Sequence, residues 1–279
     1  MRKDYRISDL KDYINWGYFF HAWSLPPLSE ERQHLHDEAE KMLQRLQPYV
    51  KVKTVVELMP AWSEGDDIVV QPMRPCECGQ SHPYGEPVHL PMLRQQVPNK
   101  EGICLCLSDF IRPQSASRQD KIGIFATSTS INVEKTFPND DYNKMLLQTL
   151  ADRLAEAGAE RLHEEVRKTI WGYAPNEQLT IEELHQEKFQ GIRPAVGYPC
   201  LPDISINFLL DSLIGFKSIG VTLTSSAMMQ PHASVSGLMI SLPQAHYFSV
   251  GKISSDQRAN YAQRRHLTLE EINRYLPCC

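Results

Sequence analysis

The sequence predicts an α+β fold: a twisted, predominantly antiparallel β-sheet with helices flanking it. Several strand-like segments follow one another with only short turns between them, which favours antiparallel pairing over regular β-α-β alternation. One much longer segment, from Asp141 to about Ile170, has apolar residues near helical spacing and contains no proline. It predicts a helix of about eight turns, long enough to cross the face of such a sheet.

The N-terminal part combines an aromatic segment with a helix. The run YINWGYFFHAW, residues 13–23, is typical of a buried core. Apolar residues then fall on one face of residues 30–47, and Pro48 ends the pattern. This stretch therefore predicts an amphipathic helix.

The middle of the chain predicts strands and loops. Residues 73–100 are rich in proline, glycine and histidine and predict a loop. Apolar stretches bounded by turn residues predict four strands, at residues 51–60, 67–73, 101–111 and 121–131.

The C-terminal half predicts further elements after the long helix. Thr180 and Glu183 form a capping box that opens a short helix, and Thr268 and Glu271 form another near the end of the chain, where we expect two helices. Asp203 is expected to cap a helix that runs to about Ile214. Three more strands are predicted, at residues 217–225, 234–242 and 246–253, of which the last two would form a hairpin through residues 243–245.

Composition excludes several classes of protein. The chain has 279 residues, which suits one domain over residues 1–279, and its net charge of −5 argues against nucleic acid or an anionic membrane as a partner. The N-terminus has no apolar signal-peptide region, and the most apolar stretch, INFLLDSLIGF, is too short to span a bilayer. Seven cysteines, an odd number, favour a reducing cytoplasm over a disulfide framework.

A metal site is the less favoured interpretation of one cysteine cluster. Cys76, Cys78 and His82 lie close together in the sequence, with Cys104 and Cys106 downstream. A C-x-C pair is not the usual spacing of zinc ligands. We therefore expect no metal, and an exposed loop beside an apolar strand in which cysteine acts as a small hydrophobic residue.

The segment QGIRPAVGYP, residues 190–199, is the strongest candidate for a binding site. Pro194 pushes Arg193 toward an extended backbone, and Gly191 and Gly197 allow positive φ or close approach of another group. Arg193 is the one charged residue there, and its planar guanidinium suits a carboxylate ligand. The alternative is that Arg193 only pairs with a surface acid. Because G-x-G-x-x-G, P-loop, H-E-x-x-H and G-x-S-x-G motifs are all absent, the sequence favours a binding site over a nucleophilic or metal catalyst.

Several separated segments stand out along the chain: YINWGYFFHAWSL, ELMPAWSEGDDIVV, ADRLAEAGAERLHEEVRKTIWGYAPNE, QGIRPAVGYP, ASVSG and YFSVGKISSDQRANYA. In the correct order, they resemble the activation domain of cobalamin-dependent methionine synthase, and the resemblance covers nearly the whole chain. It implies a C-shaped module that binds S-adenosylmethionine and docks on the cobalamin domain when the cobalt is oxidised. A one-electron donor, flavodoxin in many bacteria, then reduces the cobalt, and the methyl group of S-adenosylmethionine restores methylcobalamin.

The resemblance also implies site residues. The family's acid near the reaction site corresponds to Glu156, for which a solvated helix face is the alternative. Asn15 stands where the family typically has aspartate, so it can accept a hydrogen bond from the ligand's ammonium but supplies no negative charge. The family's cofactor-binding residues correspond to Arg193, Ala195, Tyr198, Tyr247 and Phe248.

Three hypotheses of function follow. No D-x-H-x-x-G cobalamin-ligand motif occurs, so we expect cobalamin to lie in trans, on a separate cobalamin-binding methionine synthase chain that this protein reactivates. A second hypothesis, favoured by Asn15, is a corrinoid-protein docking module or chaperone that has lost S-adenosylmethionine binding. The third is an independent methyltransferase, for which no acceptor-activating base is evident.

Overall fold

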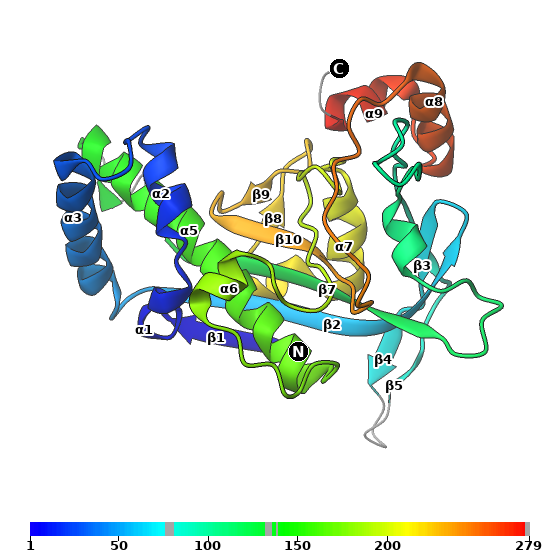
Figure 1. The fold of residues 1–279 in the computed structure, drawn as a ribbon, viewed down its shortest axis with the longest axis horizontal. Helices are drawn as coiled ribbons and strands as arrows, with labels where there is room; N and C mark the ends of the chain where they lie inside the picture. The colour runs from blue at the N-terminus through cyan, green and yellow to red at the C-terminus, as the bar shows by residue number, and fades with distance from the viewer. Residues whose placement is uncertain (76–80, 132–135, 138, 277–279) are drawn as a thin grey trace.

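An antiparallel sheet forms the centre of the protein in a computed structural model that describes residues 1–75, 81–131, 136–137 and 139–276 (Figure 1). Within these residues, the main sheet has six strands in the order β10-β7-β2-β3-β6, with β1 also paired to β2. The strands are β1 (Arg2–Arg6), β2 (Lys51–Glu64), β3 (Asp67–Val70), β6 (Val88–Pro91), β7 (Asp120–Thr129) and β10 (Ser234–Met239). The predicted α+β class with an antiparallel sheet is confirmed.

Strand β2 organises the sheet. Its first half pairs with β1 and its last residues pair with β3, while β7 runs along its other edge. Alternate residues of β2 belong to different cores: Val52 and Val56 face one hydrophobic cluster, and Val55 and Met59 face another. A strand of 14 residues that is buried on both faces accumulates enough twist to curl the sheet.

The long helix α5 (Asp141–Glu165) covers one face of the sheet and continues through a π-helical turn, Val166–Ile170. A Cβ added at Gly158 would lie 2.6 Å from Val52 Cγ1, so the absence of a side chain here lets the helix pack closely on β2. Around α5 lie α1 (Ile7–Leu10), α2 (Trp16–Ala22) and α3 (Glu30–Leu46), which complete this layer.

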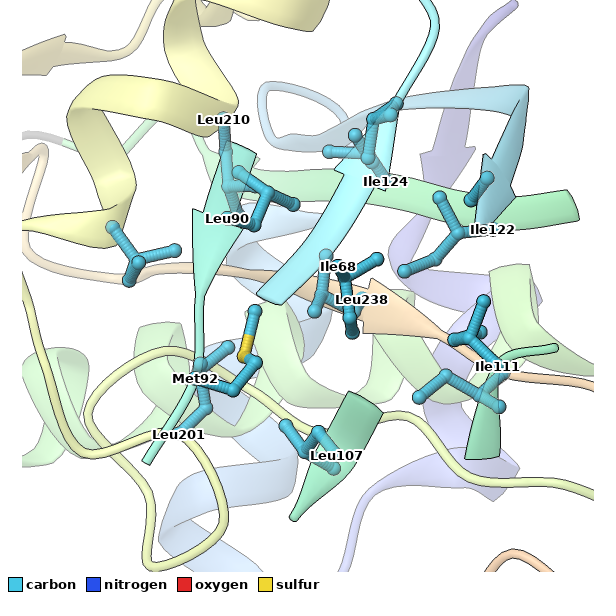
Figure 2. Packing of buried hydrophobic residues seen from close by; sticks show 14 of the residues in the cluster. Ile68, Leu90, Met92, Leu107, Ile111, Ile122, Ile124, Leu201, Leu210 and Leu238 are labelled. Carbon is cyan, nitrogen blue, oxygen red and sulfur yellow. The ribbon is translucent and has the colours of Figure 1, made fainter. Parts of the chain in front are cut away.

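The opposite face carries a second hydrophobic core. Ile68, Ile124 and Leu238 of the sheet lie near Leu107 and Leu210 in Figure 2. The elements that cover this face are the 3₁₀ helices η2 (Leu107–Phe110) and η4 (Phe216–Ile219) and the helix α7 (Ile206–Ile214). Helices α8 (Ser255–Arg264) and α9 (Leu269–Tyr275) pack together at one end of the molecule. Among the described helices, none has the length and apolarity needed to cross a membrane.

Two predictions for the middle of the chain were wrong. Residues 101–111 are not a strand: Asp109 accepts the Cys106 N–H at 2.8 Å and starts η2 instead. Arg94 fixes Asp109 through two hydrogen bonds of 2.7 Å. Residues 73–100 are not all loop, because β6 pairs with β3, and β4 (Met73–Pro75) pairs with β5 (Ser81–Pro83).

The C-terminal half brings three further corrections. Residues 217–225 form η4 and the two-residue strand β8 (Thr222–Leu223), which pairs with β9 (Met229–Gln230). Asp203 does not cap α7; Ser205 is the N-cap residue, and Asp203 accepts its N–H at 2.8 Å. Residues 246–253 form no strand, because the edge of β10 that they would need is occupied by Ile192 and Ala195.

Candidate functional site

A cavity of about 730 Å³ lies between α2, α5 and two irregular segments, residues 193–200 and 247–249. The structure brings every predicted site residue to its wall: Asn15, Glu156, Arg193, Ala195, Tyr198, Tyr247 and Phe248. These residues come from four separate parts of the chain. The sequence alone could place them together only through the family resemblance.

The segment 191–199 is held flat against β10. Its backbone pairs with the strand through Ile192 N–H to Ile240 O at 2.9 Å and Val196 N–H to Ser236 O at 2.9 Å. A Cβ added at Gly237 would lie 2.3 Å from Pro194 O, so only glycine allows this approach. The predicted special backbone is confirmed, because Gly191 and Gly197 have φ of 80° and 88°.

Arg193 is clamped by its surroundings. Its Nη2 donates to Glu160 Oε2 at 3.2 Å, its Nη1 lies 4.0 Å from Glu156 Oε2, and its guanidinium lies 5.7 Å from the centroid of the Phe125 ring. The side chain is only 11% exposed. Burial opposes its charge, but Glu160, Tyr247 and Glu156 outweigh that effect and hold the pKa of Arg193 above its usual range. Arg193 therefore pairs with acids of its own chain, and it also borders the open cavity.

Glu156 is part of a hydrogen-bonded group rather than a freely solvated helix face. Tyr198 Oη donates to Glu156 Oε1 at 2.7 Å, and the Glu156 side chain is 25% exposed. Burial and the neighbouring carboxylate of Glu156 raise the pKa of Tyr198. The phenol therefore stays protonated and can keep donating to Glu156 at neutral pH.

Asn15 has a structural role that fixes its orientation. It is the N-cap of α2, where its Oδ1 accepts the Tyr18 N–H at 3.3 Å. A Cβ added at Gly17 would lie 3.1 Å from this oxygen, so the acceptor is also closely packed. With Oδ1 engaged by the Tyr18 N–H, Asn15 keeps its Nδ2 as a donor, and the residue lines the cavity.

Tyr247 and Phe248 also line the cavity. Tyr247 Oη accepts the Arg193 N–H at 2.9 Å, which links the two irregular segments. Burial raises the pKa of Tyr247 to about 12, against the lowering effect of Arg193. The backbone N–H of Phe248 donates to Cys200 Sγ at 3.1 Å, so both residues are fixed by partners on the 193–200 segment.

Sequence reasoning missed several charged residues of the wall. Asp152 and Glu160 flank Glu156 at intervals of four residues on α5, and Arg153 and Glu187 also line the cavity. Burial raises the pKa of Asp152, and burial together with Glu160 raises the pKa of Glu187. The signal for the helix residues was present in the sequence, since side chains four apart share one face of a helix.

The cysteine cluster is only partly described by the structure. Cys76 and Cys78 lie outside the described residues, as do Cys278 and Cys279. Among the residues that are described, no three His, Cys, Asp or Glu side chains are grouped as metal ligands. Cys106 is buried in the hydrophobic core, and burial raises the pKa of its thiol to about 11.

The protein therefore belongs to the α+β class and has a cavity lined by charged residues beside the long helix α5. A family model described as "Vitamin B12 dependent methionine synthase, activation domain" matches residues 6–266, so the chain belongs to this family. The chain is also similar to the crystal structure of the MetH reactivation domain bound to AdoHcy, S-adenosylhomocysteine. The TM-score is 0.87 and the identity 37%, over 99% of this chain and 88% of that one. The fold expected from the resemblance is confirmed.

Proposed function

We propose that this protein binds S-adenosylmethionine in the cavity beside α5 and supports the reductive methylation of cob(II)alamin held on a separate protein. The observation that carries the proposal is the convergence of the predicted binding residues on one cavity of about 730 Å³. That volume lies within the usual range for small-molecule sites. The similar reactivation domain is bound to AdoHcy, which differs from S-adenosylmethionine by one methyl group and its charge.

Five of the predicted binding residues have a task in this proposal. Arg193, already held at Nη2 by Glu160, offers its remaining N–H groups to the ligand's carboxylate. Tyr198 and Tyr247 contribute hydroxyls and ring faces near the sulfonium. Ala195 is small enough to leave backbone groups accessible to the adenosine, and Phe248 supplies an apolar surface.

Cobalamin enters this proposal as a substrate carried by the partner, a cobalamin-binding methionine synthase chain. Flavodoxin or a similar donor would provide the electron. The contribution of this chain is to hold the methyl sulfonium in one orientation at the mouth of the cavity, which is catalysis by positioning. Glu156 is the proposed acid nearest the reaction, and its hydrogen bond from Tyr198 fixes its place.

Calorimetric titration with S-adenosylmethionine tests ligand binding. The wild-type protein should bind it, and Arg193→Ala should weaken binding by about tenfold or more, the cost of losing charge-assisted hydrogen bonds. Arg45→Ala, which removes an exposed arginine of α3, is the matched control and should bind normally. Reactivation is then measured with a cobalamin-binding methionine synthase chain, flavodoxin and reductant. Lack of binding by the wild-type protein would contradict the proposal.

The second candidate is a docking module without S-adenosylmethionine. The ion pair between Arg193 and Glu160 favours it, because a ligand carboxylate must share a guanidinium that already has a partner. This candidate predicts no heat from S-adenosylmethionine together with tight association of the wild-type protein with a cobalamin domain. The titration and a sedimentation experiment therefore separate the two functions.

A further inference from the structure

Two buried side chains of the long helix and its π-helical turn hold the residue that leads into the binding segment 191–199. His163 lies on α5, Arg167 lies on the π-helical turn, and both contact the ring of Phe189. We infer that Arg167, His163 and Phe189 form a clamp that positions Arg193 for the carboxylate of the ligand. The inference rests on the proposed function and adds positioning residues that do not themselves line the cavity.

The Phe189 ring has a cation and an aromatic ring as partners. The Arg167 guanidinium lies over it, 4.4 Å from the ring centroid, and the His163 ring meets it in a T-shaped contact at 4.9 Å. Phe189 is 8% exposed, and Arg167 and His163 are completely buried. A cation over an aromatic face is attracted more strongly when water is excluded, so burial makes this contact a firm one.

Arg167 is itself fixed in one orientation. Its Nε donates to Glu177 Oε2 at 2.9 Å and its Nη2 donates to Glu177 Oε1 at 2.7 Å. Its backbone oxygen accepts the Ala174 N–H at 2.9 Å. Replacing a buried ion pair by apolar residues is often neutral or stabilising, so the pair is better explained by the geometry that it imposes. π-Helical turns such as Val166–Ile170 are rare and frequently occur at functional sites.

The clamp and β10 hold the two ends of a short stretch of chain. Phe189 comes three residues before Ile192, whose N–H donates to Ile240 O at 2.9 Å. Between them, Gly191 has a φ of 80°, and a Cβ added there would lie 2.2 Å from Ile240 O. Three residue steps span at most about 11 Å. A shift of Phe189 therefore reaches Arg193 across a short and sterically restricted stretch.

Arg193 depends on this support because few hydrogen bonds of its own fix the guanidinium. In the described part of the chain, its Nε and the Oε1 of Glu160 are buried without hydrogen-bond partners. Its Nη2 donates to Glu160 Oε2 at 3.2 Å. Burial and the charges of Arg167 and Arg193 lower the pKa of His163, so the imidazole is neutral at pH 7 and does not repel either guanidinium.

Calorimetry on the full chain with two ligands tests the clamp: S-adenosylmethionine and its decarboxylated analogue. The ratio of the two affinities isolates the carboxylate contact, because the adenosine, sulfonium and amine are common to both ligands. Arg193→Ala should lower this ratio by about tenfold and sets the value for a lost contact. Phe189→Leu should lower it by about threefold or more, part of the same contact, with little change for the decarboxylated analogue.

Variants of Arg167 test the other side of the clamp. Arg167→Met combined with Glu177→Gln removes both charges together, so no unpaired charge stays buried. This double variant should lower the ratio as Phe189→Leu does. Arg167→Lys keeps a cation beside Glu177 and Phe189 but loses the planar guanidinium, so it should retain more of the wild-type ratio.

Ile68→Ala is the control for a general loss of stability. Ile68 is completely buried in the core on the opposite face of the sheet and does not line the cavity. Its variant should melt at a lower temperature, because the truncation leaves a cavity. It should nevertheless keep the wild-type ratio of affinities.

The possible outcomes are distinct. A wild-type ratio in Phe189→Leu, or an equal loss of affinity for both ligands, overturns the clamp and leaves S-adenosylmethionine binding intact. A ratio that falls as far in Ile68→Ala also overturns it, because the effect would then follow from lower stability alone. If the double variant does not fold, Phe189→Leu decides the question. No binding of either ligand by the wild-type protein overturns both this inference and the proposed function.

Discussion

The two irregular segments that line the cavity are held in different ways. Residues 191–199 are fixed by backbone hydrogen bonds to β10 and by the close approach of Pro194 to Gly237. Residues 246–253 have no strand partner among the described residues and are fixed mainly by contacts with Cys200, Pro199 and Gln95. The wall of the cavity thus combines one segment held by backbone hydrogen bonds with another held by a few individual contacts.

Because the two segments are held differently, losing the contacts of each should have different effects on the protein. Losing the anchor of the first segment should disturb the sheet itself, because β10 belongs to it. Losing one contact of the second segment should loosen only that segment, because segments with few backbone hydrogen bonds open locally at a low cost in free energy. The first three predictions below test this contrast, and the fourth concerns Asp152 on the α5 side of the same cavity.

Gly237→Val should have the largest effect. The added side chain would enter the space of Pro194 O, which lies 2.3 Å from the position of a Cβ, and of the Phe125 ring at 3.0 Å. We expect the free energy of unfolding to fall by about 3 kcal/mol, measured by urea denaturation, with ligand binding lost. Gly65→Ala is the control: its φ is 58° and no atom lies within 4 Å, so its cost should be about 1 kcal/mol. Wild-type stability of Gly237→Val would show that the anchor is not rigid.

Cys200→Ala should loosen the second segment. Cys200 Sγ accepts the Phe248 N–H at 3.1 Å and donates to Phe248 O at 2.6 Å, and both bonds would be lost. We expect a loss of about 1–2 kcal/mol and faster amide exchange confined to residues 247–251. Cys104→Ala alters a less buried thiol and should leave this exchange unchanged. Uniformly faster exchange over β10 as well would contradict the separation of the two segments.

The structure shows why the sequence predicted some of these features and not others. The long helix, the strands predicted at 51–60 and 67–73 and both capping boxes depend on local patterns, and the structure has each of them, with β2 extending to Glu64 and β3 ending at Val70. The predicted strand at 246–253 failed because the edge of β10 is occupied by residues distant in sequence. The acids beside Glu156 were visible as a spacing on α5, but only the fold shows that this helix face borders a cavity.

Tyr247→Phe should have a smaller and local effect. It removes the acceptor of the Arg193 N–H, a bond of 2.9 Å that joins the two segments. We expect a loss of about 1 kcal/mol in stability and weaker protection of the Arg193 amide against exchange. Tyr49→Phe, at an exposed position, should change neither quantity. Unchanged protection in Tyr247→Phe would mean that another group fixes Arg193.

Asp152→Asn should have the smallest effect on stability. The direction of this effect tests whether the charge of the Asp152 carboxylate opposes folding. Burial raises the pKa of Asp152, so the folded protein binds this proton more tightly than the unfolded chain does. The stabilising contribution is present below the ordinary carboxylate pKa and is lost as the pH rises through the folded value. At pH 7 the charged form therefore opposes folding, and the asparagine variant should melt slightly higher.

The pH dependence of melting distinguishes this effect from a simple packing change. The gain from Asp152→Asn should shrink as the pH falls toward about 4, the usual pKa of an aspartate, because the wild-type side chain then becomes neutral as well. Glu164→Gln should behave oppositely: burial raises the pKa of Glu164, but Tyr13, Lys168 and Arg161 outweigh it and lower the pKa overall. That variant should lose stability at pH 7 and approach the wild type in acid. If the gain in melting temperature from Asp152→Asn persisted in acid, the charge of the Asp152 carboxylate would not be the cause of the lower stability of the wild type.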